Sequence, residues 1–273
     1  MERLPAATPG AATLVGSAVI VCLLVVNAKG LPFVHSIRLL PSLYRLLRPR
    51  LFSSRKGVPE RASAASTPAA TAEAPLAARP GLFQHHITRS RAVLSDLDVN
   101  IHKSNSTFFA DADINRAELL TRRLIGGLVG AVPLLAAVQC TFKREIGPFQ
   151  AYDLSSRVLC WDEKSLFIVT YFLKPRTALP PDVELAGGPA AALQDASLRR
   201  TIYAVMVTRY VCKSKGRKTV APASVLKHAG LLVKAVGTPG VDKADPLDAQ
   251  LLAPSAVETA VKAGMEYVRD CMV

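Results

Sequence analysis

The stretch SDLDVNIHKSNSTFFADADINRAELL, residues 95–120, places acids, amides and a histidine directly ahead of a helical pattern. A carboxylate ahead of a helix can attack a carbonyl carbon or activate water, and Asp96 and Asp98 both lie in this stretch, followed by His102. A helix start near Asn105 would add free backbone N–H groups and a partial positive charge, which stabilise a developing oxyanion. These residue types in this order are suited to attack on a carbonyl group.

The same residues also have a purely structural interpretation. Acid-rich loops ahead of helices often only cap them, and Asn105 or Ser104 is a natural N-cap. On this interpretation Asp96 stabilises the loop, and His102 forms local hydrogen bonds.

The helix that must position this loop is predicted over residues 106–124. Asp113 and Arg116 project toward its apolar side and, three residues apart, can pair with each other. The apolar side consists of Phe108, Phe109, Ala112, Ala117, Leu119, Leu120 and Leu124, and the opposite side of Asp111, Asn115, Glu118 and Arg122.

Several β-prone segments accompany the helix. Residues 162–164 form a polar turn between two of them, which predicts a hairpin. Residues 176–197 hold Pro and Gly clusters, which predict a loop insertion. The strands are predicted at 86–95, 137–143, 152–161, 165–174 and 201–213. One long helix with several strands indicates an α+β domain in which an antiparallel sheet wraps around a central helix.

The N-terminal third has a different character. Residues 10–28 carry no charge, and Lys29 and further basic residues follow. This pattern predicts a transmembrane helix with the domain facing the cytosol, as in a single-pass protein of the endoplasmic reticulum. A signal peptide, a mitochondrial presequence (hence a mitochondrial location) and a buried core helix are the alternatives.

These patterns predict five segments along the chain. Residues 1–30 form the anchor, which contacts membrane lipid, and residues 31–56 form a basic amphipathic helix that lies either on a membrane surface or on the domain. Residues 57–82, rich in Ala, Pro and Ser, form a disordered linker. The main domain spans 83–222, and a helical or irregular extension spans 223–273.

Composition excludes several classes of protein. The chain has 273 residues and a formal net charge of +13, but no aromatic-basic stripe accompanies the positive charges, which argues against nucleic acid as a partner. The five cysteines lack Cys-x-x-Cys or Cys/His spacing, which argues against a zinc site or a disulfide framework. No metal and no cofactor is predicted, because nucleotide-binding, serine-hydrolase and metalloprotease motifs are absent from the sequence.

The order of elements and the loop residues resemble hotdog-fold thioesterases of the 4-hydroxybenzoyl-CoA thioesterase type. More narrowly, they resemble the membrane-anchored group that includes thioesterase superfamily member six. The shared pattern consists of an acidic pair, a histidine, an asparagine pair, an aromatic residue and a helix arginine. In this sequence it corresponds to Asp96, Asp98, His102, Ser104-Asn105, Phe108 and Arg116.

The resemblance covers residues 83–220 and implies hydrolysis of an acyl-CoA thioester in lipid metabolism by a homodimer whose site lies at the dimer interface. It implies Asp98 as base or nucleophile, Asn105 as a residue that orients substrate or water, and His102 as a proton-handling or loop-holding residue. Backbone donors from Asn105, Ser106 and Thr107 would bind the substrate carbonyl.

Two departures from the family pattern leave alternatives open. Ile101 stands where a glycine usually precedes the histidine, and Ser104 replaces the first asparagine. A catalytically degenerate hotdog protein that binds lipid or acts as a scaffold is therefore one alternative. A hotdog hydratase is another, although the segment 98–102 lacks the proline of the hydratase motif and is one residue short.

A basic segment, KSKGRK at 213–218, follows the last strong strand. Lys213, Lys215 and Arg217 could contact the phosphates of coenzyme A, because Lys and Arg form charge-assisted bonds with phosphate. A solvated turn is the structural alternative.

Overall fold

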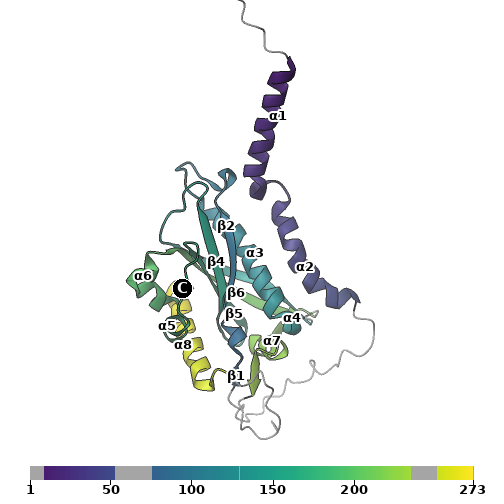
Figure 1. The fold of residues 1–273 in the computed structure, drawn as a ribbon. Coiled ribbons are helices and arrows are strands. Elements are labelled where there is room, and N and C mark those ends of the chain that lie inside the picture. Colours follow the sequence, from purple (N-terminus) through teal and green to yellow (C-terminus); the bar gives the residue numbers. More distant parts are fainter. Residues whose placement is uncertain (1–8, 53–75, 129, 215, 235–250, 273) are drawn as a thin grey trace, which may run out of the picture.

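The computed structural model of the protein describes residues 9–52, 76–128, 130–214, 216–234 and 251–272. A six-stranded antiparallel sheet has the strand order β2-β4-β5-β6-β3, with β7 paired to β6. The helix α3 (Asn105–Arg123) lies along one face of this sheet (Figure 1). The strands are β2 (His86–Arg91), β3 (Ala131–Phe142), β4 (Ala151–Trp161), β5 (Ser165–Leu173), β6 (Ile202–Ser214) and β7 (Thr219–Val220). This arrangement is the hotdog fold that the sequence resemblance implied.

The predicted strands and the central helix are confirmed, with two changes. β3 begins at Ala131, ahead of the predicted 137, and β2 ends at Arg91, ahead of the predicted 95. The prediction of a loop insertion at 176–197 is wrong, because this segment forms α5 (Pro181–Gln194) and α6 (Ala196–Arg199). Its prolines do not prevent helix formation, since Pro181 stands in the first turn, where its missing N–H costs nothing.

The helix α3 is buried on more than its apolar side. Phe108 and Ala112 pack against the sheet, but Asp111 and Asn115 of the predicted polar side are also buried. The predicted Asp113–Arg116 pair is confirmed, with 2.8 Å between Oδ1 and Nη2. The helix is therefore the centre of the domain, and its buried polar groups must find partners inside the protein.

A second helical layer covers the opposite face of the sheet. α8 (Pro254–Met272) and α5 lie side by side there, and Val268 belongs to the same apolar cluster as Leu159, Phe167 and Val205. At Gly264, α8 comes so close to β4 that an added Cβ would lie 2.9 Å from Cys160 Cβ. The helix α8 is thus part of the folded core.

Smaller elements close one end of the domain. β1 (Leu76–Ala78) pairs with β8 (Leu232–Lys234) in a separate two-stranded sheet, and α4 (Ile125–Leu128) packs against α7 (Pro222–His228). Two 3-10 helices, Pro80–Leu82 and Leu94–Asp96, flank β2. Most of the linker predicted at 57–82 lies outside the described residues.

The N-terminal segment forms α1 (Pro9–Val26), the 3-10 turn η1 (Ala28–Gly30) and α2 (Val34–Phe52). The predicted transmembrane helix, and with it the single-pass membrane location, is contradicted: within the described ranges, no helix is both long enough and apolar enough to cross a membrane. α2 packs along α3, which favours the packed alternative for this amphipathic segment.

A buried ion cluster joins the N-terminal segment to the domain. Lys29 Nζ lies 2.7 Å from Asp96 Oδ2, 2.8 Å from Asp111 Oδ2 and 3.0 Å from the Tyr152 hydroxyl. Lys103 Nζ, which is fully buried, lies 2.9 Å from Asp111 Oδ2 and 3.5 Å from Asp96 Oδ2. Tyr152 also donates to Asp111. We refer to Lys29, Asp96, Lys103, Asp111 and Tyr152 as the ion cluster.

The charges of the ion cluster control the ionisation of its members. Burial opposes the charged form of Asp111, but Lys103 and Lys29 outweigh that cost and hold its pKa below the ordinary value. Burial lowers the pKa of Lys103, and burial together with the Asp111 charge raises the pKa of Tyr152. Asp111 is therefore an ionised acceptor on which two ammonium groups and a phenol converge.

The close approach at Gly264 predicts the effect of a single added methyl group. Gly264→Ala gains about 1 kcal/mol of helix propensity but forces a contact with Cys160 Cβ and the Leu159 carbonyl, at 2.9 and 3.1 Å. Because both neighbours belong to a central strand, we expect a net loss of roughly 1–2 kcal/mol in the free energy of unfolding. Urea unfolding measures this loss, with the exposed Ser255→Ala in the same helix as control. A variant as stable as the wild type would show that α8 does not pack on β4 in this way.

The lowered pKa of Asp111 predicts a pH-dependent stability. The contribution of the Asp111 carboxylate to the free energy of unfolding is fully present above the ordinary carboxyl pKa of 3.8. It is lost as the pH falls through the lower pKa of the folded state. Asp111→Asn should lower the free energy of unfolding by roughly 3–5 kcal/mol at pH 7, because it leaves Lys29 and Lys103 to share Asp96 as the one carboxylate of the ion cluster. The stability of the Asp111→Asn variant should also fall less steeply than that of the wild type as the pH drops below about 4, because the variant lacks this carboxylate.

Thermal unfolding from pH 3 to 7 measures both effects. The exposed Glu163→Gln is the control and should follow the wild-type curve. Equal stability of Asp111→Asn and the wild type at pH 7 would contradict the role given to the ion cluster.

Candidate active site

The loop ahead of α3 is a tight turn closed by its own backbone. Asp98 N–H donates to the His102 carbonyl at 2.9 Å, and Ile101 N–H donates to the Asp98 carbonyl at 3.0 Å. Ile101 has a φ of +59°, a left-handed conformation that explains why glycine is the common residue at this position. Asp98 Oδ1 accepts from the N–H groups of Asn100 (2.9 Å) and His102 (3.4 Å). The carboxylate is thus oriented by the turn while the residue stays exposed.

The first turn of α3 keeps free donors. Ser104 is the N-cap residue, but its hydroxyl contacts Ser106 Oγ at 3.1 Å instead of capping the helix. Thr107 N–H and its hydroxyl both donate to the Ser104 carbonyl, at 3.0 and 2.8 Å. In the part of the chain that the structure describes, no acceptor is assigned to the N–H groups of Asn105 and Ser106. These two donors can serve an oxyanion.

The predicted catalytic residues share one cavity. Asp98, His102 and Asn105 line a space of about 370 Å³, together with Asn100, Lys103, Phe108, Phe142, Lys143, Arg144 and Glu145. We refer to it as the loop cavity. It places a carboxylate, an imidazole and an amide side chain at the start of the central helix.

Side chains from the end of β3 form the opposite wall of the loop cavity. His102 Nε2 lies 3.1 Å from Glu145 Oε2, and the Phe142 ring meets the Phe108 ring edge-on with 5.2 Å between centroids. The Phe108 ring also lies beneath the Lys103 ammonium, 5.3 Å from its centroid. Through Lys103, the floor of the loop cavity is connected to the ion cluster.

The predicted substrate-binding residues do not all meet at the loop cavity. Thr107 points toward the ion cluster, because its hydroxyl accepts from Lys103 Nζ at 2.9 Å. Lys213 pairs in register with Val132 at the start of β3, the strand end remote from the loop cavity, and donates to Thr219 Oγ1. Arg217 is exposed in the β6–β7 turn, and Lys215 lies outside the described residues. Within one chain, this turn is far from Asp98.

Sequence reasoning missed the cations that do line the loop cavity, Lys143 and Arg144. Both N–H groups of this pair donate to the Tyr203 carbonyl, at 2.8 and 3.0 Å, which holds the strand end beside β6. The available signal was the basic pair directly after a predicted strand, in the sequence TFKREIG.

Cys140 and Cys212 are not suited to act as nucleophiles. Burial raises the pKa of Cys140 to about 12 and that of Cys212 to about 11, so these thiols are poor nucleophiles at neutral pH. Across the described ranges, no group of three or more His, Cys, Asp or Glu side chains is arranged to hold a metal ion. The loop cavity offers a carboxylate, an imidazole and backbone donors, a set suited to acyl transfer to water.

Comparisons with known proteins find similarity to thioesterases. Residues 92–229 match the family model described as the thioesterase-like superfamily. The chain is 40% identical over 172 residues to thioesterase poxG of Penicillium oxalicum, covering 56% of each chain. It is 33% identical over 264 residues to probable thioesterase atnL of Emericella nidulans, covering 89% of this chain and 80% of the relative. It is also 26% identical over 98 residues to protein THEM6 of Xenopus laevis, covering 34% of this chain and 46% of the relative.

These matches confirm the resemblance that the loop residues indicated. The aligned region spans little more than half of the Penicillium relative, so the activity of that whole protein is not transferred here. The match to the family model covers the polar loop, α3 and the strands β3 to β7. The chain belongs to the thioesterase-like superfamily.

Proposed function

We propose that the protein hydrolyses an acyl-CoA thioester at the loop cavity. The observation that carries this proposal is the convergence of Asp98, His102 and Asn105 on one cavity at the first turn of α3, where two backbone donors have no assigned acceptor within the described residues. The thioesterase names of the relatives support the same reaction class.

In this proposal Asp98 acts as a general base. It takes a proton from a water molecule as the water oxygen forms a bond to the thioester carbon. The negative charge that develops on the carbonyl oxygen is stabilised by the N–H groups of Asn105 and Ser106 and by the positive end of α3. Collapse of this intermediate breaks the C–S bond, and the proton held by Asp98 returns to the leaving thiolate. The products are a carboxylic acid and coenzyme A.

Neighbouring side chains have supporting roles in this scheme. His102 holds the loop against Glu145 and so keeps the Asp98 carboxylate at the cavity. The Asn105 side chain orients the water or the thioester carbonyl, since it lines the same cavity.

One observation favours a second function, binding without hydrolysis. Asp98 Oδ1 already accepts two N–H groups of its own turn, so one oxygen of the proposed base is already engaged by the protein. A hotdog protein with this loop could bind an acyl thioester as a lipid-binding or scaffold protein.

We further propose that the protein forms a homodimer through β3. This strand ends the sheet, with β6 as its only partner strand among the described residues. Val132, Leu134, Leu135 and Phe142 are exposed along it, which is unusual for a free edge. Antiparallel pairing of two copies would bring the partner's β6–β7 turn toward this chain's loop cavity. Lys213 and Arg217 would therefore contact substrate only across the dimer.

Replacing Asp98 separates the two functions. Asp98→Asn should lower kcat/KM for acyl-CoA hydrolysis by about 100-fold or more, because it removes the proposed base. Turnover is measured with the full chain on a panel of acyl-CoAs, beside the exposed Glu163→Gln as a control that keeps wild-type rates. Hydrolysis that survives in Asp98→Asn would discard Asp98 as the base. Absence of hydrolysis by the folded wild type would favour the binding protein.

A charge on β3 tests the dimer. Leu135→Lys should convert a dimer to a monomer. Each of the two copies would carry a lysine on β3, and pairing would bury both positive charges in an otherwise apolar interface. Sedimentation velocity measures the change, with Ile87→Lys on the other edge strand as a matched control, since Ile87 is also exposed. A monomeric wild type, or dissociation by Ile87→Lys alone, would contradict pairing through β3.

A further inference from the structure

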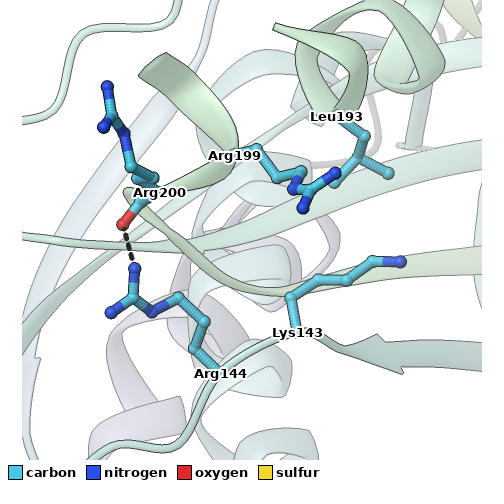
Figure 2. Close-up of a pocket in the computed structure, with 5 residues that line it drawn as sticks. All are labelled: Lys143, Arg144, Leu193, Arg199 and Arg200. Atoms are coloured by element: carbon cyan, nitrogen blue, oxygen red, sulfur yellow. Dashed lines mark hydrogen bonds between the residues drawn. The ribbon is translucent and has the colours of Figure 1, made fainter. Parts of the chain in front are cut away.

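A second cavity lies directly beside the loop cavity and is lined by positive charge. It has a volume of about 560 Å³ and is bordered by Lys143, Arg144, Leu193, Arg199 and Arg200 (Figure 2). We refer to it as the basic cavity. Two of its cations follow β3, and the other two lie at the end of α6, so four basic residues from distant parts of the sequence border one cavity.

A backbone carbonyl holds one of these cations, Arg144, in place without neutralising it. Arg144 Nη1 donates to the Arg200 carbonyl at 2.8 Å, which connects the two segments. The nearby Asp195 carboxylate is engaged at the start of α6, where it accepts from the Ser197 and Leu198 N–H groups at 2.7 and 3.0 Å. Among the described residues, no carboxylate forms an ion pair with any of the four cations. Four unpaired positive charges around one cavity favour an anionic ligand.

The basic cavity and the loop cavity share two walls. Lys143 and Arg144 line both, so a ligand bound at Asp98 can continue past them toward Arg199 and Arg200. A coenzyme A thioester has this form, because its reacting carbon is joined through a long pantetheine arm to a nucleotide with several phosphates. Arginine suits such groups, since its guanidinium binds phosphate oxygens in pairs.

We propose that the basic cavity binds the nucleotide phosphates of coenzyme A while the thioester lies at the loop cavity. This assignment rests on the proposed hydrolysis and adds the residues that select a coenzyme A thioester over one lacking the nucleotide. Arg199 and Arg200 are the specificity-determining pair, because they line the basic cavity and not the loop cavity.

The position of the β6–β7 turn supports this choice within one chain. Lys213 lies beside the first residues of β3, and Lys143 follows its last residue. β3 has 12 residues, which at ~3.3 Å per residue span about 40 Å. The basic cavity adjoins the loop cavity, whereas the turn of the same chain does not.

The test compares substrates that differ only beyond the pantetheine arm. Hydrolysis of an acyl-CoA and of the matching acyl-pantetheine is measured for the full chain and for Arg199→Ala/Arg200→Ala. The variant keeps the Arg200 carbonyl that accepts from Arg144, and both side chains are exposed, so the fold should persist, which circular dichroism checks. Lys164→Ala/Lys262→Ala removes two exposed cations elsewhere and is the charge-matched control.

We expect KM for acyl-CoA to rise roughly 10- to 100-fold in Arg199→Ala/Arg200→Ala, as for the loss of one or more charge-assisted bonds to phosphate. Hydrolysis of acyl-pantetheine should be unchanged, and the control should match the wild type on both substrates. Equal losses on both substrates would overturn the proposal, as would a wild type that hydrolyses both equally well. A rise in KM for Arg217→Ala in place of the arginine pair would assign the phosphates to the β6–β7 turn and also overturn it.

A direct binding measurement distinguishes failure of the proposed hydrolysis from failure of the proposed phosphate site. If the wild type hydrolyses neither substrate, isothermal titration with free coenzyme A decides the matter. Binding that is lost in Arg199→Ala/Arg200→Ala and retained in the control would support the phosphate site without the reaction. Absence of binding by the wild type would overturn it.

Discussion

The ionised carboxylate of Asp111 is the group on which the arrangement around the site depends. It lies on the central helix and is buried. It forms ion pairs with Lys29 and Lys103 and accepts a hydrogen bond from the Tyr152 hydroxyl. Removing charges from water is costly, so such a group persists only when its partners are fixed in place. Each partner belongs to a different segment: the N-terminal turn, the polar loop and β4. One buried charge thereby sets the relative positions of three segments and α3.

This constraint reaches the loop ahead of α3 through Lys103. Its ammonium lies in the ion cluster, and its backbone N–H donates to the Ile146 carbonyl at 2.8 Å. The turn from Asp98 to His102 stands immediately before it, and the first turn of α3 comes two residues after it. A polar loop on a protein surface would ordinarily be mobile, but here its base is fixed by charge and its tip by the Asp98 hydrogen bonds. Such preorganisation is what an oxyanion site requires.

The sequence predicts local features well and distant pairings poorly. The helix over 105–123 and the strands follow from short periodic patterns, and the Asp113–Arg116 pair follows from helical spacing. The Lys29–Asp111 contact joins residues 82 positions apart, and no pattern in either segment indicates it.

The segment 176–197 illustrates a different reason for error. Its Pro and Gly residues indicated a loop, yet Gly188, at a φ of +60°, kinks α5 and Pro189 follows directly after the kink. The basic cavity was missed because its two arginines follow this misread segment. Only the folded chain shows that they face the end of β3.

The two-sided cover of the sheet has a consequence for the motions of the molecule. All nine residues of β5 are buried, its edges are paired with β4 and β6, and helices lie over both faces. Its amide hydrogens can reach solvent only when both helical layers and both neighbouring strands separate, which amounts to global unfolding. The loop ahead of α3 is held at both ends by Asp96 and Lys103, but the residues 98–100 at its tip are exposed. Amide exchange would therefore be slowest along β5 and faster at this tip, which can move while the core stays closed.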